Sequence, residues 1–166
     1  NKISLGYEKT IITGIKYCLK KKYRFIATID GDAQHDPNFF KNISKIKKFD
    51  LLIAKRDKYN RFSEYLFAYF CKNTLKIDDP LSGMKVYNYD TLKKIRKIKN
   101  YNTLNTFLLF QLNKHCKKIY QISSKIRKRN DISRLGNFLV GELKVFKSLL
   151  KLMLLIFLMK IFKLVI

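Results

Sequence analysis

Three carboxylates lie close together in a chain that is otherwise dominated by basic residues. Asp30, Asp32 and Asp36 are near neighbours, although the whole chain holds 12 Asp and Glu against 36 Lys and Arg. The apolar, β-branched run Phe25–Ile29 favours a buried strand that ends at Asp30. Alternate residues of an extended segment point to the same side, so Asp30 and Asp32 are expected to bind one divalent cation together. Mg²⁺ or Mn²⁺ suits these ligands, with Gln34 or water and substrate phosphates completing the shell.

The same stretch excludes some chemistry and leaves one plain alternative. A calcium-binding EF-hand loop does not fit, because His35 stands where that loop needs Gly and Lys41 stands where it needs Glu. The chain has two histidines, His35 and His115, which leave little from which to build a His-rich metal site or a His-based triad. Two acids near a strand end are also common as solvated turn residues, and that is the alternative to a metal site.

Apolar periodicity predicts the elements that must hold these carboxylates. Residues 7–21 have helical spacing, and Asp36 is expected to cap a helix with Pro37 in its first turn. The other expected elements are strands at 51–54, 84–88 and 119–126, and helices at 62–70, after a cap at Asp90, and at 104–116. This alternation predicts an α/β fold with a mostly parallel sheet, helices on its faces, and ligands at the carboxyl ends of the strands.

Composition limits the kind of protein further. A length of 166 residues suits one domain, and 47% hydrophobic residues with only six Gly and two Pro suffice for a sizeable core. Cys18, Cys71 and Cys116 are odd in number and widely spaced, which argues against a disulfide framework and against a structural zinc site. A reducing cytosol fits this cysteine pattern.

The net charge of +24 implies an anionic partner, unless the lysines are simply solvated. That partner is a nucleic acid, a bilayer with acidic lipids, or a phosphate-bearing substrate. Most aromatic residues fall on apolar helix faces instead of between basic residues, which disfavours a single-strand nucleic-acid binder. Clustered carboxylates would also repel nucleic-acid phosphates in the absence of a metal.

The C-terminal segment 137–166 is apolar with spaced lysines and is expected to associate with a membrane. Leu152–Met159 contains no polar residue but is too short to span a bilayer, which takes about 20 apolar residues. Lys144, Lys147 and Lys151 fall on one helical face, as in a helix that lies in a bilayer interface. The alternatives are a helix packed on the domain core and the start of a hairpin membrane anchor.

Several motifs occur in an order that is typical of one enzyme family. Ile29–Pro37 resembles the DxDxQHxP signature of family 2 glycosyltransferases, the group that includes dolichol-phosphate mannose synthase and bacterial polyprenyl-phosphate sugar transferases. Gly6–Gly14 is similar to the family's glycine-containing helix start, and Ala54–Arg56 to its G-S-R segment. Asp79–Gly83 resembles the D-P-x-S-G-F loop, and Arg127–Gly136 the basic R-x-x-G-x-S-K region.

The chain departs from the family pattern at identifiable positions. Lys55 replaces the serine of G-S-R, and Met84 replaces the phenylalanine of S-G-F. In the basic region Asp131 replaces the glycine, and Lys128 falls where an arginine would align. The family's first βαβ segment, whose loop holds the nucleotide base, has no counterpart here, so residues 1–136 are expected to form a partial catalytic domain.

The resemblance implies a GT-A fold and a metal-dependent glycosyltransferase of hexosyltransferase type that inverts the anomeric centre. The donor would be a nucleotide diphosphate-sugar, and the acceptor a polyprenyl-phosphate or lipid-linked glycan. The protein would work at the cytoplasmic face of the cell membrane, peripheral to it or anchored in it. The alternatives are an inactive fragment that binds membranes and a basic nucleic-acid-binding protein.

The resemblance also implies roles for individual residues. It assigns the metal to Asp30, Asp32 and Gln34, the nucleotide-sugar to Asp30, Asp32, Arg56 and Arg61, and the acceptor to Ser82, Gly83, Arg127 and Arg129. Guanidinium groups suit the arginine roles because they pair bidentately with phosphate oxygens. Arg56 and Asp79 are the expected catalytic residues, with Asp79 as the candidate base; the alternative role of Asp79 is to brace the turn at Pro80.

Overall fold

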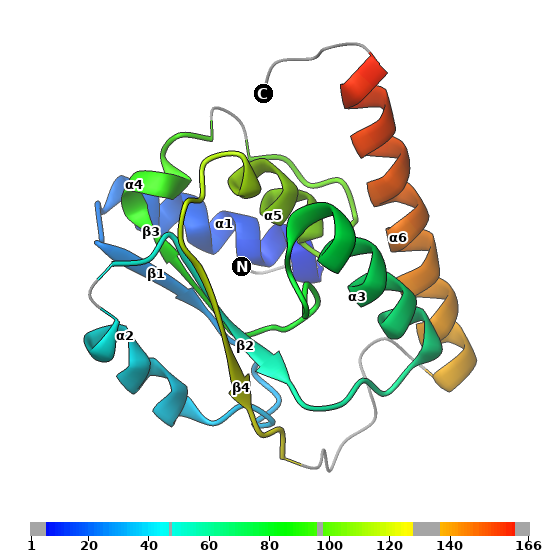
Figure 1. The fold of residues 1–166 in the computed structure, drawn as a ribbon, viewed down its shortest axis with the longest axis horizontal. Coiled ribbons are helices and arrows are strands. Elements are labelled where there is room, and N and C mark those ends of the chain that lie inside the picture. Colours follow the sequence, from blue (N-terminus) through cyan, green and yellow to red (C-terminus); the bar gives the residue numbers. More distant parts are fainter. Residues whose placement is uncertain (1–5, 47, 96–97, 128–136, 162–166) are drawn as a thin grey trace.

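The computed structural model describes residues 6–46, 48–95, 98–127 and 137–161, which form one four-stranded sheet with flanking helices (Figure 1). The strands are β1 (Phe25–Thr28), β2 (Leu51–Arg56), β3 (Lys85–Asn88) and β4 (Ile119–Ser124). The helices are α1 (Tyr7–Lys20), α2 (Asn42–Lys45), α3 (Phe62–Leu75), α4 (Tyr89–Leu92), α5 (Thr106–Asn113) and α6 (Phe138–Ile161), with a 3₁₀ turn η1 (Pro37–Lys41) before α2. The predicted α/β class with flanking helices and a C-terminal helix is confirmed.

The strand order is β1-β3-β2-β4, and β3 runs against its neighbours. The pairing of β2 with β4 is parallel, with Leu51 opposite Ile119. The pairings of β3 with β1 and with β2 are antiparallel, and Lys85 lies opposite both Thr28 and Ile53. Strands β1, β2 and β4 therefore share one direction, in keeping with the predicted mostly parallel sheet, and β3 is the exception.

The reversal of β3 follows from the path between β2 and β3. Helix α3 carries the chain about 21 Å away from the end of β2. It ends at Lys76, whose φ of 59° is left-handed, and residues 76–84 bring the chain back to the same edge of the sheet. There the Ala54 N–H donates to the Met84 carbonyl at 3.1 Å. Because β3 begins beside the end of β2, it must run in the opposite direction.

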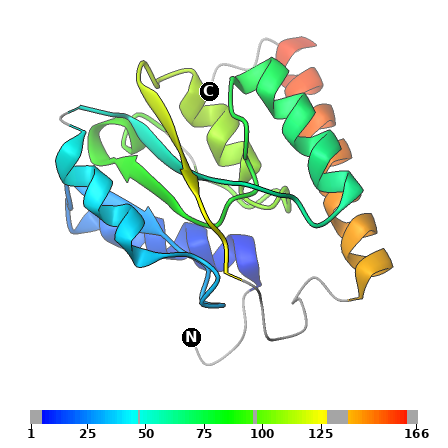
Figure 2. The same cartoon turned by 60° about the horizontal axis from the view of Figure 1, so that its bottom comes forward.

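Side chains alternate between the two faces of the sheet and build two apolar clusters. Leu51 and Ile53 belong to the larger cluster, to which α1, α3, α5 and α6 contribute. Leu52 and Ala54 belong to a smaller cluster on the other face, where Phe39 of η1 and partly buried residues of α2 pack. Figure 2 shows α2 on one side of the strands and α3 and α5 on the other. Strand β2 is therefore buried on both faces, which positions its carboxyl end firmly.

Two short helical segments begin at capping side chains. The Asp36 carboxylate accepts a hydrogen bond from the Asn38 N–H at 3.0 Å and Pro37 follows it, so the predicted cap at Asp36 is confirmed. The predicted cap at Asp90 is wrong by two residues. The Asn88 side chain accepts from the Asp90 N–H at 2.8 Å, and Asp90 itself lies in the first turn of α4. An amide oxygen at the end of β3 thus takes the capping role.

Helix α6 packs on α3 along one face and exposes apolar side chains on the other (Figure 1). Its buried face includes Val145, Leu149, Leu152 and Ile156. Seven of its exposed apolar residues recur every three or four positions and are here called the outer stripe: Leu139, Leu143, Phe146, Leu150, Leu154, Phe157 and Ile161; Phe138, Val140 and Met153 are exposed as well. The helix therefore combines a core-packed face with an unpartnered one, and part of Leu152–Met159 belongs to the core. Among the described helices, none is both long and apolar enough to cross a bilayer.

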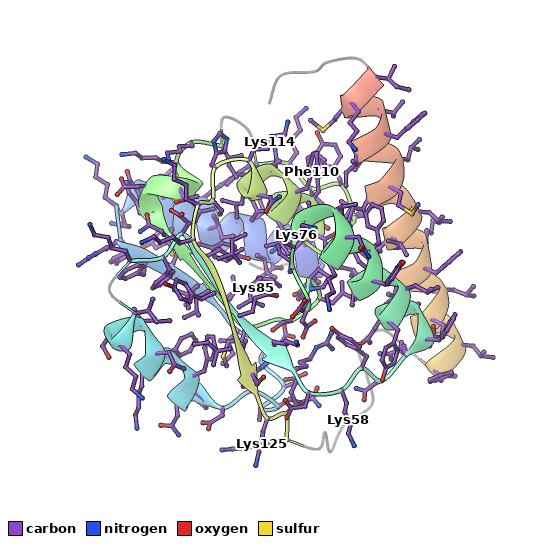
Figure 3. The ribbon with its side chains drawn as sticks, viewed as in Figure 1. Lys58, Lys76, Lys85, Phe110, Lys114 and Lys125 are labelled. Atoms are coloured by element: carbon purple, nitrogen blue, oxygen red, sulfur yellow. The ribbon has the colours of Figure 1, made fainter. Side chains whose placement is uncertain are left out.

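The basic side chains are almost all at the surface. Lys58 and Lys125 project from the lower edge of the molecule in Figure 3, at the carboxyl ends of β2 and β4. Of the lysines that the structure describes, Lys85 is the one that is buried, with 3% of its surface exposed. The bulk of the positive charge is therefore available to an anionic partner, and Lys85 needs a separate explanation.

Candidate active site

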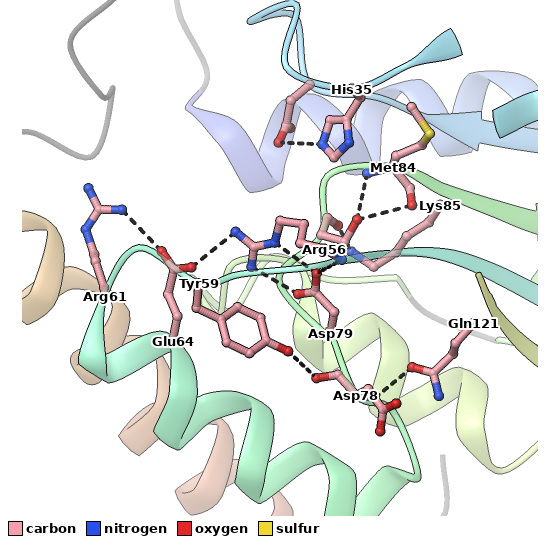
Figure 4. Close-up of polar contacts among 12 residues, drawn as sticks. His35, Arg56, Tyr59, Arg61, Glu64, Asp78, Asp79, Met84, Lys85 and Gln121 are labelled. Carbon is pink, nitrogen blue, oxygen red and sulfur yellow. Dashed lines mark hydrogen bonds and ion pairs between the residues drawn. The ribbon is translucent and has the colours of Figure 1, made fainter. Parts of the chain in front are cut away.

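Polar residues from four segments converge where β1 and β2 end and β3 begins. Asp30 follows β1, Arg56 ends β2, Lys85 begins β3, and the return segment 76–84 crosses between them. The Thr28 hydroxyl donates to the Gly83 carbonyl at 3.1 Å, which joins β1 to the return segment. Figure 4 shows these side chains gathered at one edge of the sheet. Asp30 and Arg56, which the sequence singled out, therefore lie near each other, and their role in binding a ligand stays a prediction.

Arg56 and Asp79 bind each other with two parallel hydrogen bonds. Nε of Arg56 donates to Oδ2 of Asp79 at 2.9 Å, and Nη2 donates to Oδ1 at 3.0 Å. The Arg56 backbone N–H also donates to Oδ2 at 2.9 Å, and Asp79 is fully buried. Burial alone would lower the pKa of Arg56, but its hydrogen bond to Asp79 and the charges of Asp79 and Glu64 raise it. Both oxygens of Asp79 are thus engaged, as expected for a residue that braces the return segment.

Glu64 of α3 joins the two arginines that the sequence assigns to the donor. Its Oε2 accepts from Nη1 of Arg56 at 3.1 Å, and its Oε1 accepts from Nη1 of Arg61 at 3.2 Å. The Glu64 side chain is 5% exposed, and those of Arg56 and Arg61 are 15% and 10% exposed. With Asp79, these residues form a buried cluster of two positive and two negative charges. A charge-balanced cluster of this kind holds its geometry, because removal of any member leaves a buried charge unpaired.

The return segment is fixed at Asp78 as well as at Asp79. Asp78 pairs with Lys55 at 2.8 Å, its carbonyl accepts from the Tyr59 hydroxyl at 2.7 Å, and its N–H donates to Gln121 at 2.7 Å (Figure 4). Lys55 stands where the family has serine, so this departure from the G-S-R pattern supplies a contact of its own. Residues from β2, β4 and the β2–α3 connection therefore hold the start of the return segment.

Asp30 lies against Gly83 and is surrounded by positively charged or polar groups. A Cβ atom on Gly83 would overlap the Asp30 carboxylate, so the close approach requires glycine there. His35 is buried, with Nε2 at 3.8 Å from the nearer Asp30 oxygen. Burial raises the pKa of Asp30, but the nearby His35 side chain and the positive charges of Lys85 and Arg56 lower it by more, so the pKa is below its usual value. Asp30 is therefore an ionised carboxylate that lies against Gly83 at the carboxyl end of β1.

Ser82 and Gly83, which the resemblance assigns to the acceptor, are both buried. The Met84 N–H donates to the Ser82 hydroxyl at 3.3 Å, and Nζ of Lys85 donates to the Ser82 carbonyl. The contacts of these residues are thus within the protein, and their acceptor role stays a prediction.

Asp32 and Gln34 lie in a bend after β1, and Gln34 contacts Arg127 beyond the end of β4. The strand ends at Thr28, and the bend includes Ala33 with φ of 58°, so Asp30 and Asp32 do not share the extended segment from which their common side was predicted. The Asp32 carboxylate accepts from the Gln34 N–H at 3.2 Å. Gln34 and Arg127 exchange two hydrogen bonds, from Arg127 N–H to Gln34 O at 3.0 Å and from Gln34 Nε2 to Arg127 O at 3.2 Å.

The predicted metal residues and one predicted acceptor arginine are therefore neighbours. Arg129 lies outside the described residues, as do Lys128 and Asp131. Within residues 6–46, 48–95, 98–127 and 137–161, no group of three or more His, Cys, Asp or Glu residues is arranged to hold a metal ion. A cation at this edge would need oxygen ligands from substrate or water besides Asp30 and Asp32.

Sequence reasoning did not single out Lys85, Glu64 or His35 as parts of the candidate site. Burial lowers the pKa of Lys85, the charges of Asp79 and Asp30 partly restore it, and the pKa is about 8. The signal for Lys85 was a lysine inside an otherwise apolar strand, directly after the Asp79–Gly83 loop. In a chain with 36 Lys and Arg, one more lysine carries little weight. Glu64 gave no signal beyond a polar position on an apolar helix.

The sheet order, the flanking helices and the polar edge define a GT-A-like glycosyltransferase fold. A solved structure with this fold is glucosyl-3-phosphoglycerate synthase from Mycobacterium tuberculosis in complex with phosphoglyceric acid, which matches with a TM-score of 0.55 and 17% sequence identity. The match covers 90% of this chain and 56% of that chain, so this chain spans just over half the length of the synthase. No protein-family pattern and no curated protein sequence matches the chain.

Proposed function

We propose that the chain belongs to a metal-dependent glycosyltransferase that moves a sugar from a nucleotide diphosphate-sugar to a polyprenyl-phosphate or lipid-linked glycan. The observation that carries this proposal is the ionised Asp30 at the carboxyl edge of the sheet, next to the Asp32–Gln34 bend and the Arg127 backbone. The GT-A-like fold supports it. Inversion of the anomeric centre and a hexosyl donor are part of the same proposal.

Asp30, Asp32 and Gln34 suit Mg²⁺ or Mn²⁺ because their donors are oxygens and Asp30 is kept ionised. A Cβ atom on Gly31 would meet nothing within 4 Å, so the bend leaves room above the backbone. When bound, the metal supplies positive charge against the diphosphate leaving group. Asp30 is the fixed member of the pair, and Asp32 extends the carboxylate surface outward from the bend.

We assign Arg56 and Arg61 to the donor phosphates because guanidinium groups pair bidentately with phosphate oxygens. Glu64 and Asp79 fix the orientation of the Arg56 guanidinium, which favours a preorganised clamp. For Asp79 we propose the bracing role, because both of its oxygens are bonded to Arg56 and it is buried. A phosphate acceptor is already ionised near neutral pH and needs no strong base, so this assignment is consistent with transfer to a lipid phosphate.

The acceptor side of the proposal rests on charge. Arg127 is exposed beside the Asp32–Gln34 bend, and Lys58 and Lys125 project from the same end of the sheet. We propose that Arg127, with Arg129, Ser82 and Gly83, contributes to the site of a phosphate-bearing acceptor. The solved synthase holds phosphoglyceric acid, which is also a phosphate compound.

A titration of nucleotide diphosphates tests the metal and donor assignments together. We expect GDP or UDP to bind the full-length protein more tightly with Mn²⁺ than without it, and we expect Asp32→Ala to abolish that difference. Asp90→Ala is the matched control, because Asp90 is an exposed carboxylate on α4, away from the edge. Equal affinity of Asp32→Ala and the parent in the presence of Mn²⁺ would remove the metal assignment.

The membrane part of the proposal places the protein at the cytoplasmic face, peripheral or anchored, with the outer stripe of α6 in the bilayer interface. Apolar burial at roughly 25 cal/mol per Å² should dominate, and each nearby basic residue should add about 1 kcal/mol against anionic lipid. Truncation is a poor test, because Leu149 and Leu152 belong to the core. The better test replaces Leu154 and Phe157 by Ser and measures flotation with liposomes.

For that test, Tyr17→Ser is the control, since Tyr17 is exposed on α1 and not on α6. We expect the double substitution to lose most flotation at both low and high salt. A nucleic-acid binder would behave differently, because its affinity collapses as salt rises. Undiminished flotation of the double variant would exclude the outer stripe as the membrane contact.

A further inference from the structure

Helix α3 takes its N-terminal cap from α6 instead of from its own sequence. Arg61 occupies the capping position of α3 but makes no capping hydrogen bond with its side chain. The Glu142 carboxylate fills that place, accepting from the Phe62 N–H at 2.8 Å and from the Ser63 N–H at 2.9 Å. The first N–H groups of a helix have no partner within the helix, and a carboxylate there is favoured by the helix dipole. The N-terminal part of α6 is thus bonded to the first turn of α3.

Gly141, which precedes Glu142 in α6, lies against Arg61. A Cβ atom on Gly141 would lie 2.5 Å from Nε of Arg61, so a larger residue there would displace the guanidinium from its present position. Arg61 in turn bonds to Glu64, and Glu64 bonds to Arg56. A continuous path of contacts therefore leads from Gly141 and Glu142 to the arginine that ends β2.

The opposite side of α6 has the character of a bilayer contact. The outer stripe is apolar and exposed along the whole helix, and exposed lysines such as Lys144, Lys147 and Lys160 lie on the same helix. An apolar strip beside basic residues is complementary to an interface with anionic headgroups. The net charge of +24 favours the same partner.

We propose that Glu142 is a positioning residue. It couples the binding of α6 to an anionic bilayer to the arrangement of Arg61, Glu64 and Arg56 at the site. This inference rests on the membrane association and the arginine assignment given under the proposed function. A bilayer that holds α6 in place keeps the Glu142 carboxylate on the first turn of α3. That turn carries Glu64, so the two guanidinium groups are held in their paired arrangement while the protein is on the membrane.

Hydrogen exchange at the first turn of α3 tests the coupling without any assay of sugar transfer. The full-length protein and its Glu142→Gln variant are compared with and without vesicles of phosphatidylglycerol and phosphatidylcholine. We expect vesicles to slow exchange at the Phe62 and Ser63 amides of the parent by about threefold or more, because the cap then opens less often. In Glu142→Gln we expect flotation to be unchanged and the slowing to be lost.

Asp90→Asn is the matched control, since Asp90 is an exposed carboxylate on α4 and the substitution also removes one negative charge. It should keep the vesicle-dependent slowing. A second readout is UDP or GDP affinity with Mn²⁺, which vesicles should raise in the parent and in Asp90→Asn but not in Glu142→Gln.

Each outcome has a separate meaning. If the parent fails to float with vesicles, the membrane part of the proposed function fails and the coupling fails with it. If the parent floats but its Phe62 and Ser63 amides exchange at the same rate, membrane association stands and the coupling is overturned. The coupling through Glu142 is also overturned if Glu142→Gln shows the same vesicle-dependent slowing as the parent.

Discussion

Two charged regions lie at the same edge of the sheet and differ in how their charges are satisfied. One of them, here called the Arg56–Asp79 region, consists of Arg56, Arg61, Glu64 and Asp79. Both of its carboxylates are bonded to an arginine, and its side chains are almost fully buried. In the Asp30–Gln34 bend, the Asp32 side chain is partly exposed and accepts a hydrogen bond from the Gln34 N–H. The first region is held in place by its own contacts, whereas the second is the region to which the proposed function assigns a cation. Both regions contain residues from motifs of the same family, so the motifs alone do not show this difference.

The largest expected effect is on stability, in the rigid region. Asp79→Ala should lower the free energy of unfolding by about 3–5 kcal/mol, because it leaves the buried Arg56 without its two-bond partner. Urea unfolding followed by circular dichroism measures this loss. Asp90→Ala, which removes an exposed carboxylate paired with Lys93, should cause little change. A loss for Asp79→Ala as small as that of Asp90→Ala would show that the Arg56–Asp79 region does not brace the fold.

The sequence predicted most of the elements because each of them carries a local signal, either an apolar stripe at helical spacing or a short apolar, β-branched run. Helices α1 and α3 and strands β1 and β2 follow local periodicity, and their predicted bounds are close to the observed ones. The direction of β3 depends on where residues 76–84 return, and no local pattern encodes that path. Packing of the C-terminal helix on the core was one of several alternatives in the sequence analysis, and the sequence left it open because it depends on where α3 lies.

The site was predicted as a set of residues but not as a set of contacts. Arg56 and Asp79 were both singled out, yet their mutual bond spans 23 positions in the sequence and follows from the return segment. Glu64 and Lys85 were missed because their importance comes from burial. Neither residue type nor spacing shows which lysine of a very basic chain is buried.

The buried Lys85 should make the free energy of unfolding depend on pH. Its pKa in the folded protein is about 8, against 10.5 for an ordinary lysine, because burial disfavours its charge more than Asp79 and Asp30 favour it. Between these values the unfolded chain holds a proton that the folded chain has lost, so stability contributed by Lys85 rises with pH from about 8 to about 10.5. The full rise is roughly 3 kcal/mol.

The measurement is urea unfolding of the parent and of Lys85→Met between pH 7 and pH 10.5. Other groups titrate in this range, and burial raises the pKa of Cys71 and of Cys116 to about 12, which opposes the rise. The informative quantity is therefore the difference between the two proteins. A difference that does not change with pH would mean that Lys85 titrates as an exposed lysine does and is not buried beside Asp79 and Asp30.

Gly83→Ala should have a smaller effect on stability but a clear effect on the bend. The added methyl group would overlap the Asp30 carboxylate, so Asp30 or the return segment must move. We expect a loss of about 1–3 kcal/mol, as is typical of overpacking. Gly31→Ala is the control, because a Cβ atom there meets nothing within 4 Å. Mn²⁺-dependent binding of UDP or GDP should fall for Gly83→Ala, and equal behaviour of the two variants would contradict the close packing of Asp30 on Gly83.

Asp32→Ala should have the smallest effect on stability, and that is what makes it informative. Asp32 is partly exposed, and the loss of its hydrogen bond to the Gln34 N–H should change the free energy of unfolding by no more than about 0.5 kcal/mol. The same substitution should remove the Mn²⁺ dependence of nucleotide diphosphate binding. Asp79→Ala should do the opposite, because its main effect is a loss of stability. If Asp32→Ala instead unfolds as easily as Asp79→Ala, the bend is a structural element like the Arg56–Asp79 region, and the two regions do not differ in the way that their contacts indicate.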